Sequence, residues 1–404
     1  MRWMFIAAIA VAACMAPARA AELPDVIKIG VLTDLSGTYA ANAGPGGVAA
    51  AKLAVEDFGG KVLGRPVEIV AGDEQNNPDL ASSITRGWLD REGVVAVADG
   101  GNSATSLAAL SVLKDHDRAF LITGPATTAI TNQACTPISV HFTYDSYALG
   151  NTLVSPLVKQ GADSWFFITA DYAGGIALQN GMSQFVEKAG GKIVGSIRHP
   201  FPNADFASYL LAAQASNAKV VATANAGADT INTLKQAAEF GIGRDGKQQI
   251  AVSLFFINEI NAVGLPTAQN LLTAVSFYWD LNEATRAFTK RMREARHTDE
   301  PPEMTQAGTY SAVLHYLKAV QATGTVSGSV VVAKMKEMPV NDLWNKDVVI
   351  RADGRVLNDM HLMRIKAPGE SKHPYDFFKV VATLPGKDAF QPLSQSKCPL
   401  LAQR

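Results

Sequence analysis

The feature that most constrains the fold of this chain is an alternation of short β-branched runs with longer helical patterns. Strands are expected at residues 27–32, 67–71, 94–98 and 119–123. Helical patterns lie between them, at residues 46–58, from Asn77-Pro78 onward, and at 103–114. Strands connected by helices at this spacing pair in parallel through right-handed crossovers. The first part of the chain therefore predicts a doubly wound α/β layer.

The same alternation starts again further along the chain. Strands are expected at residues 165–169, 193–197, 220–224 and 250–254, with helices at 176–189, 206–215 and 229–240. The remaining patterns are helices at 283–296, 304–322 and 329–338 and strands at 360–365 and 377–382. This remainder is too small for a third domain, so we expect it to complete the first two. Several crossings between two lobes make a hinge that can bend.

The predicted fold class is therefore α/β, with two doubly wound parallel-sheet lobes joined by a multi-strand hinge. Lobe 1 is expected to take residues 24–142 and 279–355, and lobe 2 residues 143–278 and 356–404. The first crossing is expected at residues 137–145.

The first twenty residues (1–20) have the pattern of a signal peptide for export. Arg2 gives a positive start, and residues 4–13 are an apolar run too short to span a bilayer. Ala18-Arg19-Ala20 fits a signal peptidase, so the mature protein is expected to begin at Ala21 and to work outside the cytoplasm. The alternative is a lipobox at residues 11–14, which would leave a lipid-anchored Cys14. We favour soluble export because a better cleavage site follows.

The net charge limits the possible partners, and the cysteines bear on the compartment. The formal net charge of −1 supplies no basic field for nucleic acid, and no second apolar stretch approaches twenty residues. Apart from Cys14, the chain has Cys135 and Cys398, which usually pair in an oxidising compartment. Two separate buried thiols are the alternative. The wide cysteine spacing and seven scattered histidines predict no metal site.

Candidate binding groups lie in the turns that follow two strands of the first lobe. The turn at residues 99–105 contains Asn102 and Ser103, and the turn at 124–128 contains Thr127. Ligands of open parallel sheets bind beyond the carboxyl ends of the strands, near helix N-termini. Hydroxyls and free backbone amides from two such turns would form a cradle for a carboxylate. The alternative is that Ser103 and Thr127 only cap their own helices.

The opposite wall would come from strand ends of the second lobe. Aromatic and polar residues follow these strands, at Asp171-Tyr172, 225–227 and Phe255-Phe256, with 277–279 soon after. Rings at strand ends suit an apolar or aromatic ligand body. The alternative is that the phenylalanines belong to the core. Tyr172 and Tyr278, which have polar tips, are better candidates for the cleft.

Six segments along the chain carry a family resemblance. They are residues 27–40 (IKIGVLTDLSGTYA), the serine turn at 100–105, 122–129 (ITGPATTA), 141–150 (HFTYDSYALG), 169–175 (TADYAGG) and 204–210 (ADFASYL). In this order they resemble the periplasmic substrate-binding proteins of branched-chain amino acid (Leu/Ile/Val-binding) type ABC importers. The resemblance implies the type I periplasmic binding fold, a periplasmic location and no cofactor. It also implies a monomer that captures a small-molecule carboxylate and delivers it to a membrane permease without catalysis.

The resemblance also implies site residues, position by position. Ser103 matches the serine that holds the ligand carboxylate, and Thr127 matches the threonine that assists it. Tyr172 matches the cleft tyrosine of the second lobe. The full candidate set for ligand binding is Gly101, Asn102, Ser103, Ala126, Thr127, Tyr39, Tyr172, Asn225, Gly227, Phe256 and Tyr278.

One departure from the family bears on the ligand. Amino-acid binders of this family pair the ligand ammonium with an acidic residue of lobe 2, whereas Glu259 lies several residues past the strand here. A buried ammonium without a carboxylate is unfavourable. Phe255, Phe256, Tyr278 and Trp279 resemble the subgroup that takes up aromatic and other non-amino carboxylates. We therefore expect an organic acid, with an aromatic acid favoured; a branched-chain or other amino acid is the alternative.

An enzyme and a sensor are the two alternatives to an importer. Residues 44–49 satisfy the G-x-G-x-x-A pattern of a NAD-dependent enzyme, with Asp73 and Glu74 further on. In such enzymes that turn directly follows the first strand, and here about eleven residues intervene. A sensor of the same fold that signals to a receptor is the second alternative, which neighbouring genes would distinguish from an importer.

Overall fold

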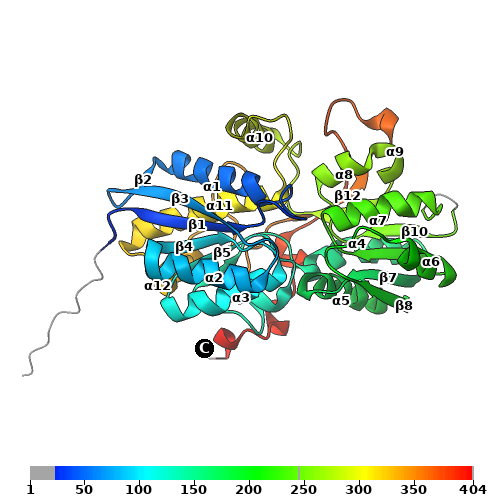
Figure 1. Cartoon of the computed structure of the whole chain (residues 1–404), viewed down its shortest axis with the longest axis horizontal. Helices are drawn as coiled ribbons and strands as arrows, with labels where there is room; N and C mark the ends of the chain where they lie inside the picture. The colour runs from blue at the N-terminus through cyan, green and yellow to red at the C-terminus, as the bar shows by residue number, and fades with distance from the viewer. Residues whose placement is uncertain (1–22, 244–245, 403–404) are drawn as a thin grey trace, which may run out of the picture.

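The computed structural model describes residues 23–243 and 246–402, which form two α/β lobes side by side (Figure 1). The predicted signal peptide and the alternative lipid anchor at Cys14 lie outside the described residues. In the described part of the chain, no helix combines the length and apolar character needed to cross a membrane.

Lobe 1 contains a six-stranded sheet with the order β2-β3-β1-β4-β5-β6, in which only β2 and β3 pair antiparallel. Its strands are β1 (Ile27–Thr33), β2 (Lys61–Val62), β3 (Arg65–Asp73), β4 (Val94–Asp99), β5 (Ala119–Ile122) and β6 (Ser139–His141). One face carries α1 (Gly44–Phe58) and α11 (Met304–Thr323), and the other carries α2 (Pro78–Gly87) and α3 (Ser103–Leu113). Helix α10 (Glu283–Arg296) packs on α1, and α12 (Gly328–Glu337) packs on α11.

The sequence of β1 explains how its sheet is covered on both faces. Ile29 and Val31 pack in the core shared with α1 and α11, because alternate residues of a strand point to the same face. On the other face Gly30 meets the ring of Trp88, and a Cβ on Gly30 would lie 2.5 Å from that ring. The glycine is therefore needed for close packing there.

Lobe 2 contains a seven-stranded sheet with the order β13-β12-β11-β10-β9-β7-β8. Its strands are β7 (Ser164–Ala170), β8 (Lys192–His199), β9 (Val220–Ala224), β10 (Gln249–Val252), β11 (Leu272–Val275), β12 (Met360–Ile365) and β13 (Phe378–Leu384). One face carries α4 (Ser146–Lys159) and α5 (Ala173–Lys188), and the other carries α6 (Ala207–Ala215) and α7 (Ala228–Glu239). The short helices α8 (Ile257–Val263) and α9 (Leu265–Ala268) connect β10 to β11.

The predicted fold class is confirmed, and the structure differs from the prediction in strand direction and in two elements. The pairs β11–β12 and β12–β13 are antiparallel, so the second sheet is parallel-dominated and not wholly parallel. The sequence pattern predicts neither β11 nor α4. Helix α4 contains Gly150 and Pro156, residues that interrupt a helical pattern, and tertiary packing against α5 stabilises it nevertheless.

The chain passes between the lobes at three connections, β6 to α4, β11 to α10, and α12 to β12. The expected lobe boundaries after residues 142, 278 and 355 fall in these connections, and the exact limits of the lobes stay a prediction. A parallel bridge between His141 and Arg355 holds the first and third connections side by side. Several connections in parallel permit bending at the hinge.

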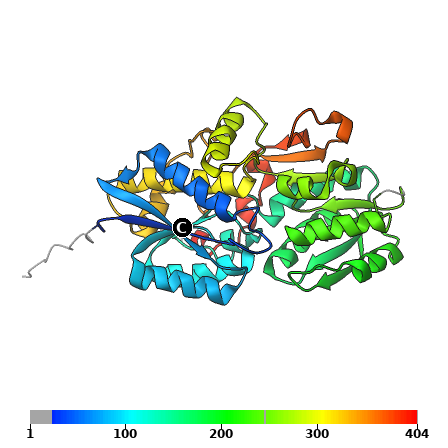
Figure 2. The ribbon, with the colours of Figure 1, turned by 45° about the horizontal axis from the view of Figure 1, so that its top comes forward.

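The end of the chain makes a fourth passage and returns to lobe 1. Asn151 of α4 donates to the carbonyls of Asp388 and Ala389, near α13 (Gly386–Ala389). Further on, a disulfide joins Cys398 to Cys135, with Cα atoms 5.4 Å apart. The expected pairing of these two cysteines is present. The last described residues therefore lie against lobe 1 and not lobe 2, as the red end of the ribbon in Figures 1 and 2 also shows.

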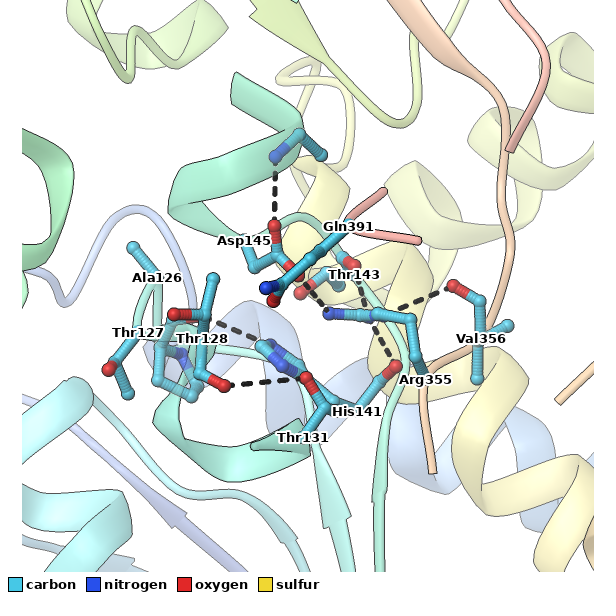
Figure 3. A network of polar contacts seen from close by, with 12 residues as sticks. Ala126, Thr127, Thr128, Thr131, His141, Thr143, Asp145, Arg355, Val356 and Gln391 are labelled. Atoms are coloured by element: carbon cyan, nitrogen blue, oxygen red, sulfur yellow. Dashed lines mark hydrogen bonds and ion pairs between the residues drawn. The ribbon is translucent and has the colours of Figure 1, made fainter. Parts of the chain in front are cut away.

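Arg355 is a fully buried residue at the centre of the hinge. Its guanidinium donates to the carbonyls of His141 and Thr143 from the first connection, and pairs with Asp145 at 3.4 Å (Figure 3). Asp145 also caps α4, because its other carboxylate oxygen accepts from the backbone N–H of Ala148 at 2.9 Å. Burial lowers the pKa of Arg355 to about 10, so the guanidinium remains charged at neutral pH. This side chain, which lies in the third connection, thus holds the first connection and the start of α4 in place.

Candidate functional site

A cavity of about 40 Å³ lies between the lobes, at the carboxyl ends of strands from both sheets. Its lobe 1 wall follows β1, β4 and β5, and its lobe 2 wall follows β7, β9 and β10. The lining residues are Asp34, Tyr39, Asn42, Ala43, Gly101, Asn102, Ser103, Gly124, Pro125, Ala126, Tyr144, Tyr172, Leu178, Ala226, Leu254, Phe256 and Thr305.

Ser103 is the first residue of α3, and its hydroxyl is free to donate. Its Oγ accepts from the backbone N–H groups of Ala126 and Thr127, both at 3.2 Å. Within the described ranges no hydrogen bond uses the hydroxyl hydrogen or the backbone N–H of Ser103. The side chain does not cap α3; Asn102 does, accepting from Ala104 and Thr105. Ser103 therefore offers a hydroxyl and a helix-terminal N–H to an anion.

The capping alternative holds for Thr127. Its Oγ1 accepts from the backbone N–H of Ala129 at 3.2 Å, and the residue does not line the cavity. Asn102 does line the cavity, but its side chain is occupied by capping and by a bond to Asn76 at 3.0 Å. The candidate anion cradle is therefore the hydroxyl and backbone N–H of Ser103 with the backbone of Gly101 beside them, because the N–H of Ala126 already donates to Ser103.

Two carboxylates near the cavity are largely occupied by donors of the protein itself. Asp34 accepts four hydrogen bonds, from the backbone of Ser36, Gly37 and Tyr39 and from the Asn76 side chain. A carboxylate has about four lone-pair sites, so those of Asp34 are filled. Glu259 accepts from Asn42 at 2.9 Å, Gly227 at 2.5 Å and Phe256 at 3.1 Å, and it does not line the cavity.

Aromatic residues form much of the remaining wall. The hydroxyls of Tyr39 and Tyr172 are hydrogen-bonded at 2.8 Å across the two lobes, and Phe201 stacks on both rings. Burial raises the pKa of Tyr172 to about 12, so the pair is neutral at physiological pH. The bond between the hydroxyls consumes one of the two hydroxyl hydrogens, which leaves the other for a ligand. Phe256 and Tyr144 complete this side, with their rings edge to face at 6.4 Å.

Three other candidates do not line this cavity. Asn225 is buried behind it, where it accepts from Thr230 at 2.9 Å. Gly227 allows the lobes to approach, because a Cβ there would lie 2.4 Å from the carbonyl oxygen of Thr38. Tyr278 lines a separate cavity beside it. The ligand contacts of all eleven candidates stay predictions, and seven of them meet at the cavity: Tyr39, Gly101, Asn102, Ser103, Ala126, Tyr172 and Phe256.

Ten residues that line the cavity are outside the candidate set: Asp34, Asn42, Ala43, Gly124, Pro125, Tyr144, Leu178, Ala226, Leu254 and Thr305. Asp34 directly follows β1, a strand end like those that hold the candidate residues, so the same signal could have found it. Thr305 lies in the first turn of α11, which is distant in sequence and is brought to the cavity only by the return of the chain to lobe 1.

The lobes are closed over the cavity by direct contacts. Asn42 of lobe 1 donates to Glu259 of lobe 2 and accepts from Asn258 at 3.0 Å. Glu303 of lobe 1 accepts from the backbone N–H groups of Ile257 and Asn258, at 3.2 and 2.8 Å. The two lobes are therefore in direct contact around the cavity.

A buried acid behind the anion cradle gives a pH-dependent prediction. Glu74 is fully buried, and a Cβ on Gly101 would lie 2.3 Å from its Oε1. Burial, then the charges of Asp34 and Asp99, raise the pKa of Glu74 from 4.5 to about 8. At a pH between these two pKa values, Glu74 holds a proton in the folded state and releases it in the unfolded state. Stability should therefore fall as the pH rises through that window.

We expect Glu74→Gln to flatten the fall in unfolding free energy between about pH 5 and 8, since glutamine does not titrate. Part of the pH dependence should remain in this variant, because the pKa values of Glu259 and Glu303 are also raised to about 8. Urea unfolding at several pH values measures this slope, with Glu68→Gln, at an exposed position of the strand that Glu74 follows, as control. Equal slopes for wild type and Glu74→Gln would show that Glu74 is ionised in the folded protein.

Comparisons with known proteins agree with this geometry. A family model described as periplasmic binding protein matches residues 26–372. A periplasmic binding protein from Burkholderia mallei is 44% identical, with a TM-score of 0.90 and coverage of 93% of this chain and 99% of that one. A branched chain amino acid ABC transporter periplasmic ligand-binding protein from Burkholderia xenovorans LB400 is 39% identical, with a TM-score of 0.81 and the same coverage, 93% and 99%.

Two more distant relatives have names that bear on the ligand. A Leu/Ile/Val-binding protein homolog 6 from Brucella melitensis is 25% identical over 313 residues, which are 76% of this chain and 79% of the relative. A solute-binding protein of an ABC transporter from R. palustris, solved in complex with benzoate, shares the fold. It is 20% identical, with a TM-score of 0.81 and coverage of 93% of this chain and 99% of that one.

Proposed function

Because this chain belongs to the periplasmic binding protein family, we propose that it is the periplasmic solute-binding component of an ABC importer for a small organic carboxylate, preferably an aromatic one. The mature protein would begin at Ala21, act as a monomer and deliver its ligand to a membrane permease. It would bind without chemical conversion and without a cofactor.

One observation carries the ligand class: Ser103 offers an unused hydroxyl hydrogen, while Asp34 is filled by four other donors and Glu259, which accepts three, does not line the cavity. The first feature supports recognition of an anion. The second leaves an ammonium group without a partner, and an unpaired buried charge is strongly unfavourable. The aromatic wall of Tyr39, Tyr172 and Phe256 supports a ring-bearing ligand body.

An amino acid is the second candidate ligand, and the name of the Brucella relative favours it. Such a ligand would need Asp34 to give up a present hydrogen bond, or Glu259, which does not line the cavity, to turn toward it. A sensor that passes its signal to a receptor would use the same site and closure, so the partner of the closed form distinguishes it from an importer.

The mechanism we propose is capture by closure. The ligand carboxylate docks at Ser103 in the open form, and closure brings Tyr172 and Phe256 of lobe 2 over the ligand. A ligand favours closure only through contacts that are better in the closed form, so it must touch both lobes. The Tyr39–Tyr172 and Asn42–Glu259 contacts add stability that belongs to the closed form alone.

Ser103→Ala is expected to weaken carboxylate binding by roughly 10- to 150-fold, which corresponds to about 1.5–3 kcal/mol for a hydrogen bond to a charged group. A thermal-shift screen of benzoates, arylpropanoates, keto acids and branched-chain amino acids would first identify the ligand. Saturation at a thousand times the dissociation constant adds about 4 kcal/mol. Isothermal titration calorimetry would then compare the variants.

The matched control is Ser111→Ala, an exposed serine of the same helix, which should leave the affinity unchanged. If Ser103→Ala binds as tightly as wild type, Ser103 does not hold the carboxylate. Stabilisation by leucine or valine, with no response to aromatic acids, would rule out the preferred ligand class.

A further inference from the structure

A buried carboxyl lies directly behind the turn that carries the candidate anion cradle. Glu74 follows β3, and hydrogen bonds fix its backbone on both sides: its N–H donates to the carbonyl of Thr33 at 3.1 Å, and its carbonyl accepts from Asn77 at 2.8 Å. A Cβ on Gly101 would lie 2.3 Å from Oε1 of Glu74 and 2.9 Å from Oγ1 of Thr105. The carboxyl and this uncharged hydroxyl therefore fill the space that a side chain at Gly101 would need.

Hydrogen bonds also connect the loop after Glu74 to the same turn. Asn76 accepts from the side-chain amide of Asn102 at 3.0 Å, and Asn102 caps α3. Ser103, the first residue of that helix, supplies the hydroxyl and the backbone N–H of the candidate anion cradle. The segment that carries Glu74 is therefore joined to the residue that we propose to hold the ligand.

The charges that act most strongly on Glu74 are all negative. They belong to Asp34, in the loop after β1, to Asp99, at the end of β4, and to the adjacent Asp73 of β3. The backbone N–H of Asn76 favours the ionised form, but neither carboxyl oxygen makes a well-formed hydrogen bond within the described ranges. Burial and these acids raise the pKa of Glu74 to about 8, so its carboxyl is mainly neutral at pH 7.

We propose that Glu74 is a positioning residue of the carboxylate site, whose neutral form supports the turn of the cradle and whose ionised form opposes the binding of an anion there. This inference rests on the proposed function. At an effective dielectric constant of about 20, two like charges within about 12 Å of each other weaken binding by at least about tenfold. Gly101 both lines the cavity and contacts the carboxyl of Glu74, so a ligand carboxylate at the cradle would lie within this range. Affinity should therefore fall as the pH rises and Glu74 ionises.

The first test is the pH dependence of carboxylate affinity. Calorimetry would measure the dissociation constants of benzoate and 3-phenylpropanoate, which stay ionised throughout, between about pH 7 and 9.5. We expect wild type to lose at least about fivefold in affinity over this range and Glu74→Gln to lose less, since glutamine does not titrate. Glu259 and Glu303 also have pKa values raised to about 8. The difference between wild type and Glu74→Gln, and not the wild-type slope alone, therefore measures the effect of Glu74.

The second test measures protons and can be made on wild type alone. Coupling between two sites is reciprocal, so a bound anion must raise the pKa of Glu74, and binding near pH 8 should take up part of a proton. Calorimetry in phosphate and in Tris, buffers with very different enthalpies of ionisation, detects this uptake as a difference in the apparent binding enthalpy. Glu74→Gln should show a smaller difference than wild type. A role of Glu74 in stability alone would not produce this difference.

Controls separate this inference from the proposed function. Glu68→Gln, at an exposed position of β3, should keep the wild-type pH profile of affinity. If the acids bind to wild type without proton uptake, or if Glu74→Gln loses as much affinity as wild type at high pH, this inference is wrong and the proposed function stands. If Glu74→Gln does not fold, the buffer comparison on wild type decides. If neither acid binds to wild type at any pH, the preferred aromatic ligand class itself fails.

Discussion

Replacing Arg355 with methionine is expected to lower the free energy of unfolding by about 3–5 kcal/mol, the usual range for breaking a buried ion pair by removing one partner. The guanidinium of Arg355 is fully buried and donates to His141, Thr143 and Val356 besides its pair with Asp145. Its removal leaves Asp145 as a buried acid without its cation. Burial already raises the pKa of Asp145 against the opposing effect of Arg355, so the variant should protonate it at a higher pH.

Guanidinium or urea unfolding, followed by circular dichroism, measures the loss. The matched control is Arg198→Met, which removes an exposed pair with Asp171 at 3.1 Å and should change stability by less than about 1 kcal/mol. Adding Asp145→Asn to Arg355→Met should restore part of the loss, since the orphaned acid is then absent. A loss below about 1 kcal/mol for Arg355→Met would mean that the hinge does not depend on this cluster.

Loss of the disulfide is expected to have the second large effect. Cys135 and Cys398 are separated by 263 residues, so their bond closes a loop over about two thirds of the 404-residue unfolded chain. The chain-entropy model allows about 5 kcal/mol for a loop of this length, and measured losses are typically about 2–5 kcal/mol. The double variant Cys135→Ala/Cys398→Ala should therefore unfold at a markedly lower urea concentration than wild type.

Non-covalent contacts of the C-terminal residues determine how much stability is lost without the disulfide. Asn132 donates to Gln391 at 3.0 Å, and Ser396 donates to the carbonyl of Thr131 at 3.1 Å. Unfolding with and without a reductant provides the control, because the reductant should weaken wild type and leave the double variant unchanged. Equal stability of wild type and the double variant would indicate that these contacts alone hold the tail.

Much of the fold could be predicted because its elements repeat a pattern that depends on local physics. Buried parallel strands are continuous apolar runs, and the helices between them follow a 3.6-residue period. Helix α4 was missed because Gly150 and Pro156 obscure that period, and its stability comes from packing on α5. The antiparallel strands β12 and β13 follow from where the chain returns, which no local pattern encodes.

In the candidate site, too, the residues that depend on local sequence could be predicted, and those that depend on distant partners could not. Ser103 could be predicted, because a glycine-rich turn after a buried strand places the next helix N-terminus at the sheet edge. The capping role of Thr127 and the burial of Asn225 behind the cavity depend on side-chain partners that spacing does not reveal. Gly227 serves the approach of Thr38 from the other lobe, a contact between residues 189 positions apart.

By itself, the sequence determined the two-lobed α/β class, the family resemblance, the pair of cysteines and the serine turn, since each depends on residues near one another along the chain. Only the tertiary structure decided which of those residues share a cavity, that the tail returns to lobe 1, and that Asp34 and Glu259 are already occupied. The physical reason is that hydrogen-bond capacity and burial are properties of neighbours in space. Closure of the hinge brings those neighbours together from distant parts of the chain.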